Sequence, residues 1–147
     1  MMRYLIIAVS LLLFSYHSPA QTLGSRFDIA IKESSVTGHP VMLVFSGSDW
    51  CKPCIQFKKS ILDSGHFEAF KKDLIVLILD FPYRKKNKPS ILIQKENELL
   101  ADRYNPSGEF PRIILVNQEK KVLGHVEYKK GMTPQEFTAS ISAISIQ

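Results

Sequence analysis

Residues 41–54 have the sequence Val-Met-Leu-Val-Phe-Ser-Gly-Ser-Asp-Trp-Cys-Lys-Pro-Cys, and this stretch decides the fold. Its first part, Val41–Phe45, is an unbroken apolar run between Pro40 and the turn residues at 46–48. A run of this length, bounded by turn residues, predicts a strand that is buried on both faces. Apolar residues after Cys54 recur at helical spacing, which predicts that a helix begins at the two cysteines.

Cys51 and Cys54 are three residues apart at the predicted start of that helix, within bridging distance of one another. Unpaired backbone N–H groups and the helix dipole stabilise a thiolate there, so we expect the pKa of Cys51 to lie below the roughly 8.5 of a free thiol. Cys51 is therefore the candidate nucleophile, and Cys54, one turn inward and shielded, is suited to resolve a mixed disulfide. Lys52 adds a positive charge, and Pro53 lies in the first turn, where helices tolerate proline.

Other uses of a cysteine pair make different demands on the sequence. A zinc site needs two further ligands, but there is no second such pair, and His39, His66 and His125 are scattered singly. Covalent haem attachment needs a histidine directly after the second cysteine, where this chain has Ile55. We therefore expect neither a metal nor a cofactor. A structural disulfide gains little entropy from so small a loop, but it stays open as an alternative to a redox pair.

Helical segments alternate with apolar runs, which predicts an α/β fold with a right-handed crossover between the first two strands. Residues 117–120 are polar and join the last two strands as a hairpin. In chain order, we expect a helix over 25–35, a strand over 41–45, a helix from the cysteine pair, a helix over 66–71, a buried strand over 74–79, a helix over 94–104, strands over 112–116 and 121–127, and a helix from Thr133. The expected inward-facing residues are Phe27, Ile29, Ala30, Ile31 and Val36 in the first helix, and Leu99 and Leu100 in the helix over 94–104.

The first twenty residues have the three-part pattern of a secretory signal peptide: Arg3, an apolar run over 5–14, and small residues that end at Ala20. The apolar run is too short for the roughly twenty residues that a membrane-spanning helix needs. We expect a signal peptide over 1–20, cleaved after Ala20, and a single domain over 21–147; an uncleaved anchor is the alternative. The expected location is periplasmic or secreted, where a cysteine pair is either oxidised or cycles.

The chain has 147 residues, of which 45% are hydrophobic and 22% are charged, close to the average of soluble globular proteins. This composition excludes a disordered chain, a collagen-like repeat and a coiled coil. The net charge of +5 is spread along the sequence, so we expect no nucleic-acid partner. Residues 82–89, which we call the basic loop, hold four cations and no acid. We expect this loop to be solvated, with a docking patch as the alternative; its cations are Arg84, Lys85, Lys86 and Lys88.

The pentapeptide Trp50-Cys51-Lys52-Pro53-Cys54 lies between a strand and a helix, and Phe110-Pro111 leads into the predicted hairpin. In this arrangement the chain resembles the thioredoxin-like family, and more narrowly its exported bacterial members, over about residues 25–146. The resemblance implies a thioredoxin-like three-layer sandwich, with a central mixed β-sheet of about four strands flanked by helices. It further implies that Pro111 is a cis proline facing the cysteine pair, in a loop that pairs briefly with an extended peptide.

The resemblance also assigns roles to individual residues. Cys51 and Cys54 are the catalytic residues, and Trp50, Phe110 and Pro111 form an apolar rim around Cys51. The implied substrate-binding residues are Trp50, Lys52, Pro53, Phe110 and Pro111.

The chain departs from the thioredoxin pattern in three places. Thioredoxins carry a buried acid in the strand before the motif, whereas Val41–Phe45 contains none, and we expect Asp49, the nearest carboxylate, to be exposed. The first strand of full-length thioredoxin is missing, which gives a trimmed version of the fold. The basic loop is not a standard feature either.

Together, these features predict a thiol–disulfide oxidoreductase acting on exported protein substrates, with the reducing direction favoured. Such a reductase needs a membrane electron donor, and we expect a monomer. The alternative is a non-catalytic thioredoxin-like module that binds peptides or assists envelope assembly, with a structural disulfide.

Overall fold

The computed structural model describes residues 25–145, so the predicted signal peptide over 1–20 lies outside the described residues. The helices are α1 (Arg26–Thr37), α2 (Lys52–Phe57), α3 (Gly65–Phe70), α4 (Ile91–Tyr104) and α5 (Pro134–Ser145). The strands are β1 (Val41–Ser46), β2 (Ile75–Asp80), β3 (Arg112–Val116) and β4 (Val122–His125). Three short helical turns complete the chain: a π turn η1 (Lys58–Leu62) and 3-10 turns η2 (Lys71–Asp73) and η3 (Lys85–Asn87).

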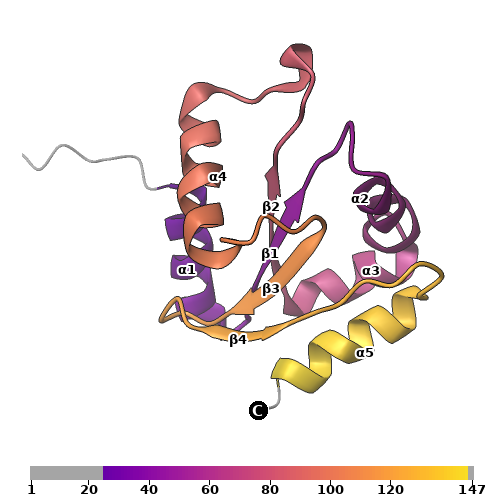
Figure 1. The fold of residues 1–147 in the computed structure, drawn as a ribbon. Coiled ribbons are helices and arrows are strands. Elements are labelled where there is room, and N and C mark those ends of the chain that lie inside the picture. Colours follow the sequence, from indigo (N-terminus) through magenta and orange to yellow (C-terminus); the bar gives the residue numbers. More distant parts are fainter. Residues whose placement is uncertain (1–24, 146–147) are drawn as a thin grey trace, which may run out of the picture.

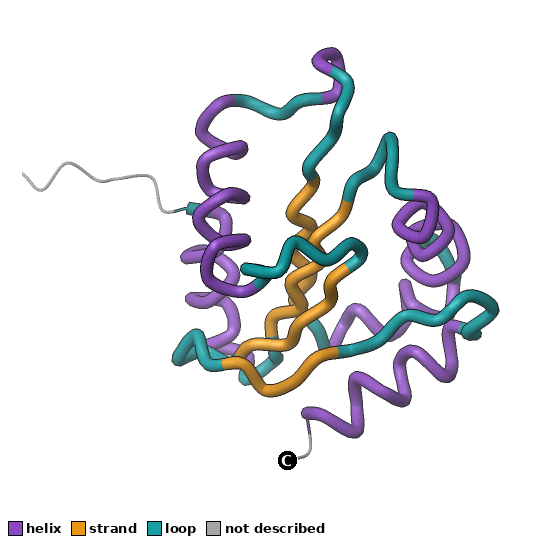
Figure 2. Tube along the Cα trace, viewed as in Figure 1, coloured by secondary structure: helices purple, strands orange, loops and turns teal. Residues whose placement is uncertain are grey.

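The four strands form one mixed sheet in the order β2-β1-β3-β4, as Figures 1 and 2 show. β1 and β2 are parallel, whereas β3 is antiparallel to both β1 and β4. The predicted crossover between the first two strands and the predicted hairpin of the last two are therefore confirmed. The described residues begin at Ser25, directly before α1, so the expected absence of the first thioredoxin strand stays a prediction.

Helices cover both faces of the sheet, with α1 and α4 on one face and α2, α3 and α5 on the other (Figure 1). β1 lies between the two layers and alternates its side chains between them. Leu43 and Phe45 pack with the α1/α4 layer, and Met42 and Val44 pack with the other layer. All four are at most 1% exposed, which confirms the prediction of a strand buried on both faces. The predicted three-layer α/β sandwich is thus correct.

The predicted inward faces of α1 and α4 are partly wrong. Ile29 and Val36 are 59% and 80% exposed, and Leu99 is 71% exposed. Each helix rests on one face of a narrow sheet, so it buries only a stripe spaced i, i+3, i+7. The buried residues of that stripe are Phe27, Ala30 and Ser34 in α1, and Asn97, Leu100 and Tyr104 in α4.

Some strand and helix limits also differ from the sequence prediction. β2 is an edge strand rather than a buried one, and its Ile78 is 41% exposed, because β1 pairs with it on one side only. β4 is the opposite edge and is shorter than the predicted 121–127. α4 begins at Ile91, three residues before the predicted start, because Ser90 is its N-cap.

The predicted start of the last helix is confirmed. The Thr133 N–H donates to Glu136 Oε2 at 2.8 Å, and the Glu136 N–H donates back to Thr133 Oγ1 at 3.2 Å. This reciprocal capping box fixes the first turn of α5, whose Phe137 and Ile141 are buried against the sheet. None of the helices described over 25–145 has the length and apolarity required to span a bilayer.

Candidate redox site

The motif begins where β1 leaves the sheet. The backbone turns at Gly47, whose carbonyl accepts hydrogen bonds from the N–H of Cys51 at 2.9 Å and of Trp50 at 3.3 Å. This turn places Cys51 at the N-cap of α2 and Pro53 within its first turn. Because α2 runs directly into the π turn η1, helical backbone continues from Lys52 to Leu62 behind the cysteines.

The two cysteines are joined in a disulfide, with Cα atoms 5.2 Å apart. The backbone N–H of Cys54 points at Cys51 Sγ at 3.2 Å, and Cys51 occupies the N-cap of the helix. A thiolate at Cys51 Sγ would therefore be stabilised by this hydrogen bond and by the positive end of the helix dipole. Cys51 is 5% exposed and Cys54 is 2% exposed, so the expected contrast between an outer and a shielded cysteine is small in this disulfide form.

Trp50, the residue before Cys51, belongs to an aromatic cluster with Phe81 and Phe110. The Trp50 indole is 48% exposed, its ring centre is 5.3 Å from that of Phe110, and its Nε1–H donates to the Phe81 carbonyl at 2.8 Å. Phe81 in turn lies 5.6 Å from Phe110, ring centre to ring centre. The structure thus brings together Trp50 and Phe110 of the predicted rim, and adds Phe81, which the sequence analysis missed.

The Phe110–Pro111 peptide bond is cis, as predicted. Pro111 directly precedes β3, and the next residue, Arg112, pairs with Phe45 near the end of β1. Pro111 is therefore at the same end of the sheet as the cysteine motif. Lys52 and Pro53, the other predicted substrate-binding residues, lie exposed on the first turn of α2.

Gly47 is required by the position of the indole. A Cβ atom at this position would lie 2.3 Å from Trp50 Cε2 and 2.6 Å from Nε1, well inside van der Waals contact. The Trp50 ring therefore packs directly over the glycine backbone. This contact holds the aromatic side chain beside the cysteine pair.

Asp49 is not the exposed carboxylate that the sequence predicted. It is half-buried, and it accepts hydrogen bonds from the N–H of Tyr83 at 2.8 Å, the N–H of Arg84 at 3.0 Å and the Asn87 amide at 2.9 Å. Partial desolvation acts to raise the pKa of Asp49, but these hydrogen bonds outweigh it, so the pKa lies below the ordinary value of 3.8. Nothing in the local sequence shows this contact, because its partners are more than thirty residues away.

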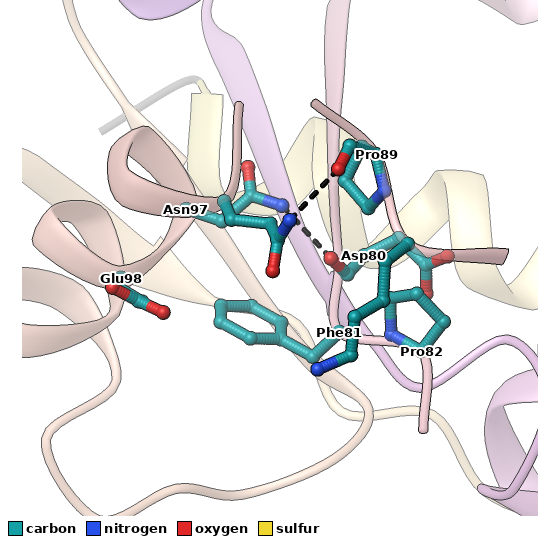
Figure 3. Close-up of a pocket in the computed structure, with 8 residues that line it drawn as sticks. Asp80, Phe81, Pro82, Pro89, Asn97 and Glu98 are labelled. Atoms are coloured by element: carbon teal, nitrogen blue, oxygen red, sulfur yellow. Dashed lines mark hydrogen bonds between the residues drawn. The ribbon is translucent and has the colours of Figure 1, made fainter. Parts of the chain in front are cut away.

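The basic loop is consequently a fixed structure, although its side chains from Tyr83 to Lys88 are exposed as predicted. The end of β2 before the loop and the last loop residue are both tied to α4: the Asn97 amide donates to the Asp80 carbonyl and the Gln94 amide donates to the Pro89 carbonyl, both at 2.8 Å (Figure 3). On the other side, the Ser48 hydroxyl and N–H donate to the Asp80 carboxylate at 2.6 and 2.9 Å. The loop and the cysteine motif are thus held together.

Among residues 25–145, no three His, Cys, Asp or Glu side chains are grouped so as to hold a metal ion. His66, one of the scattered histidines, is hydrogen-bonded to Thr138 Oγ1 at 2.9 Å.

Comparison with known proteins relates this chain to proteins of disulfide chemistry. It is 35% identical over 103 residues to the disulfide bond reductase DsbH of Chlamydia pneumoniae, a match to 69% of this chain and 60% of that protein. It is 28% identical over 92 residues to the thioredoxin-related protein DsbJ of the same organism, covering 63% of this chain and 26% of that protein. The matched region thus spans less than two thirds of the length of either relative.

Solved structures show the same architecture. A structure of a DsbH oxidoreductase superposes with a TM-score of 0.71 and 28% identity, covering 80% of this chain and 81% of that chain. A disulphide isomerase from Xylella fastidiosa superposes with a TM-score of 0.56 and 21% identity, over 81% of this chain and 88% of that chain, a likeness of fold alone.

The four-stranded mixed sheet, the cis proline before β3 and the Cys-x-x-Cys disulfide at a helix start define a protein of the thioredoxin fold. Residues 27–144 also match the family model of the thioredoxin-like domain. The chain therefore belongs to the thioredoxin-like family.

We predict that Gly47→Ala displaces the Trp50 indole, because the added methyl group occupies the space of the ring. Trp50 is the single tryptophan of the chain, so its fluorescence emission reports the change directly. We expect a shifted emission and a loss of about 1–3 kcal/mol in the free energy of unfolding. Gly65→Ala is the matched control, since a Cβ there meets nothing within 4 Å. Unchanged emission in Gly47→Ala would contradict this packing.

We predict that Asp49→Asn loosens the basic loop, because an amide offers one acceptor oxygen where the carboxylate oxygens serve three donors. Limited trypsin digestion followed by mass spectrometry should show cleavage in the loop increasing by roughly fivefold, as local opening becomes easier. Asp63→Asn is the control, because it makes the same change at a carboxylate that accepts hydrogen bonds from Lys58 and none from the basic loop. Equal cleavage in the two variants would show that Asp49 does not hold the loop.

Proposed function

We propose that this protein is a thiol–disulfide oxidoreductase that reduces disulfides in exported proteins. The observation that carries the proposal is the Cys51–Cys54 disulfide at the start of α2, with the Cys54 N–H directed at Cys51 Sγ. This arrangement favours the Cys51 thiolate once the pair is reduced, and a thiolate is the species that attacks a disulfide.

The reaction proceeds in two exchanges. The Cys51 thiolate attacks one sulfur of the substrate disulfide, the substrate S–S bond breaks, and the departing thiolate takes up a proton. Cys54 then loses its proton and attacks Cys51 Sγ, which releases the second substrate thiol and closes the Cys51–Cys54 bond. Two electrons pass from the protein to the substrate, so a dithiol donor must reduce the pair again.

Substrate binding would use the surface around the cysteines. The exposed Trp50 and the half-buried Phe110 offer an apolar wall, and the cis Pro111 at the entry to β3 leaves backbone groups for an extended peptide. Lys52 and Pro53 complete the surface on the first turn of α2. These residues are the proposed substrate-binding set.

The direction of electron flow, the partners and the location belong to the same proposal. The name of the relative DsbH, a disulfide bond reductase, supports the reducing direction. We place the protein in the periplasm or outside the cell, after cleavage of the signal peptide over 1–20 at the bond that follows Ala20. It would act as a monomer whose cysteine pair is reduced again by a membrane electron donor.

One observation favours the alternative of a non-catalytic peptide-binding or envelope-assembly module with a structural disulfide. Cys51 is only 5% exposed, and a buried disulfide reacts slowly with thiols. A trapping experiment separates the two functions.

We predict that Cys54→Ser accumulates mixed disulfides with substrate proteins, because Cys51 attacks but nothing resolves the product. Non-reducing gels of periplasmic extracts should show conjugates that disappear with dithiothreitol. The doubly substituted Cys51→Ser, Cys54→Ser protein is the matched control and should show none. The wild type should reduce insulin disulfides, and the single variants Cys51→Ser and Cys54→Ser should each lose this turnover. Absence of conjugates together with absence of insulin turnover in the wild type would favour the structural module.

A further inference from the structure

The basic loop carries four cations within five residues and no acid between Pro82 and Pro89. None of these cations forms an ion pair with another residue in the described part of the chain. Their side chains are exposed, and Tyr83 beside them is 83% exposed. Asp80 and Glu98 line a pocket with Lys88. Lys85 and Lys86 are therefore the cations that the loop presents most freely, together with one aromatic ring.

The position of this charge is fixed by the cysteine motif itself. Asp49 bonds to the loop at Tyr83, Arg84 and Asn87, and it lies two residues before Cys51. Two residues span at most about 7 Å, and the Asp49 side chain with its hydrogen bond adds about 6 Å, so the loop backbone is within roughly 13 Å of the Cys51 Cα. In Figure 1 the basic loop and the turn before α2 rise from the same end of the sheet.

Asp49 offsets part of the charge of Arg84, which helps to lower the pKa of the carboxyl group, but within the described residues it forms no ion pair with a loop lysine. Both of its oxygens are occupied by two backbone N–H groups and one neutral amide. The carboxylate thus anchors the backbone and leaves the cationic side chains free to face a partner. Trp50 adds a second anchor, because its indole donates to the Phe81 carbonyl at the base of the loop.

We propose that the basic loop determines substrate specificity, by selecting polypeptides that carry acidic residues beside the disulfide to be reduced. This inference rests on the proposed function, since it names a substrate class for the same site. A peptide bound at Pro111 with its disulfide at Cys51 would extend past the loop, where its carboxylates would be attracted by the fixed cations. Exposed Ile91 and Leu92 follow the loop, so binding to an anionic membrane surface is the competing outcome that the test below separates.

The test uses two disulfide-bonded peptides that differ only in having glutamate or glutamine on either side of the cysteine. The measured quantity is the second-order rate constant for oxidation of the reduced protein, followed by Trp50 fluorescence, so no electron donor is needed. At low ionic strength the wild type should react about five to ten times faster with the glutamate peptide. This preference should fall as salt is added, because the charges are exposed.

The loop variant combines Lys85→Gln, Lys86→Gln and Lys88→Gln. The matched control loses the same charge elsewhere, through Lys32→Gln, Lys72→Gln and Lys121→Gln, three exposed lysines of which the last two adjoin the opposite end of the sheet. The preference for glutamate should drop below about twofold in the loop variant and persist in the control. The glutamine peptide should react at the same rate with all three proteins, which shows that each is folded and active.

Each contrary result has a separate meaning. If the loop variant keeps the glutamate preference while both peptides react, the inference is wrong and the proposed function stands. If neither peptide reacts with the wild type, both the proposed function and the inference are wrong. If the loop mutations abolish binding to phosphatidylglycerol vesicles but leave the peptide preference unchanged, the loop serves a membrane surface and the inference is wrong.

Discussion

The burial of β1 on both faces is the constraint from which the site follows. This strand pairs with parallel β2 on one side and antiparallel β3 on the other, and helices cover it above and below. The strand ends at Ser46, and the chain turns at Gly47 into the cysteine motif. The position of Cys51 at a helix start is therefore a consequence of where the central strand ends.

The sequence predicts those features of the fold and site that depend on neighbouring residues or on a family motif. The apolar run Val41–Phe45 predicted the central strand, and Thr133 with Glu136 predicted the start of α5, because each signal depends on adjacent residues. The cis bond at Pro111 followed from family resemblance, since proline by itself is cis in only about one case in twenty. The cysteine pair and the Trp50–Phe110 contact were likewise predicted from the motif and its family.

Features that depend on contacts distant in sequence were missed. The sequence predicts that Leu99 faces inward, but this side chain is exposed. Apolarity alone does not show which stripe of α4 meets the sheet. Asn97 has no local sequence signal of its role: it is 1% exposed, and its amide donates to the Asp80 carbonyl at the end of β2. The role of Asp49 needed the structure for the same reason: its partners lie in a loop that the sequence shows only as polar and basic.

The chemistry of the site depends on a single helix start. The Cys51 thiolate is stabilised by the helix start and by the hydrogen bond from the Cys54 N–H. The same short segment carries the indole that packs on Gly47 and the carboxylate that holds the basic loop. The same turn of the chain thus positions the nucleophile Cys51, the apolar Trp50 side chain and the basic loop relative to one another.

The most direct measurement is the pH dependence of Cys51 alkylation by iodoacetamide in the Cys54→Ser protein, which keeps the backbone N–H at position 54. We predict a midpoint below the roughly 8.5 of a free thiol, because the helix start stabilises the thiolate. A midpoint at or above that value would contradict it.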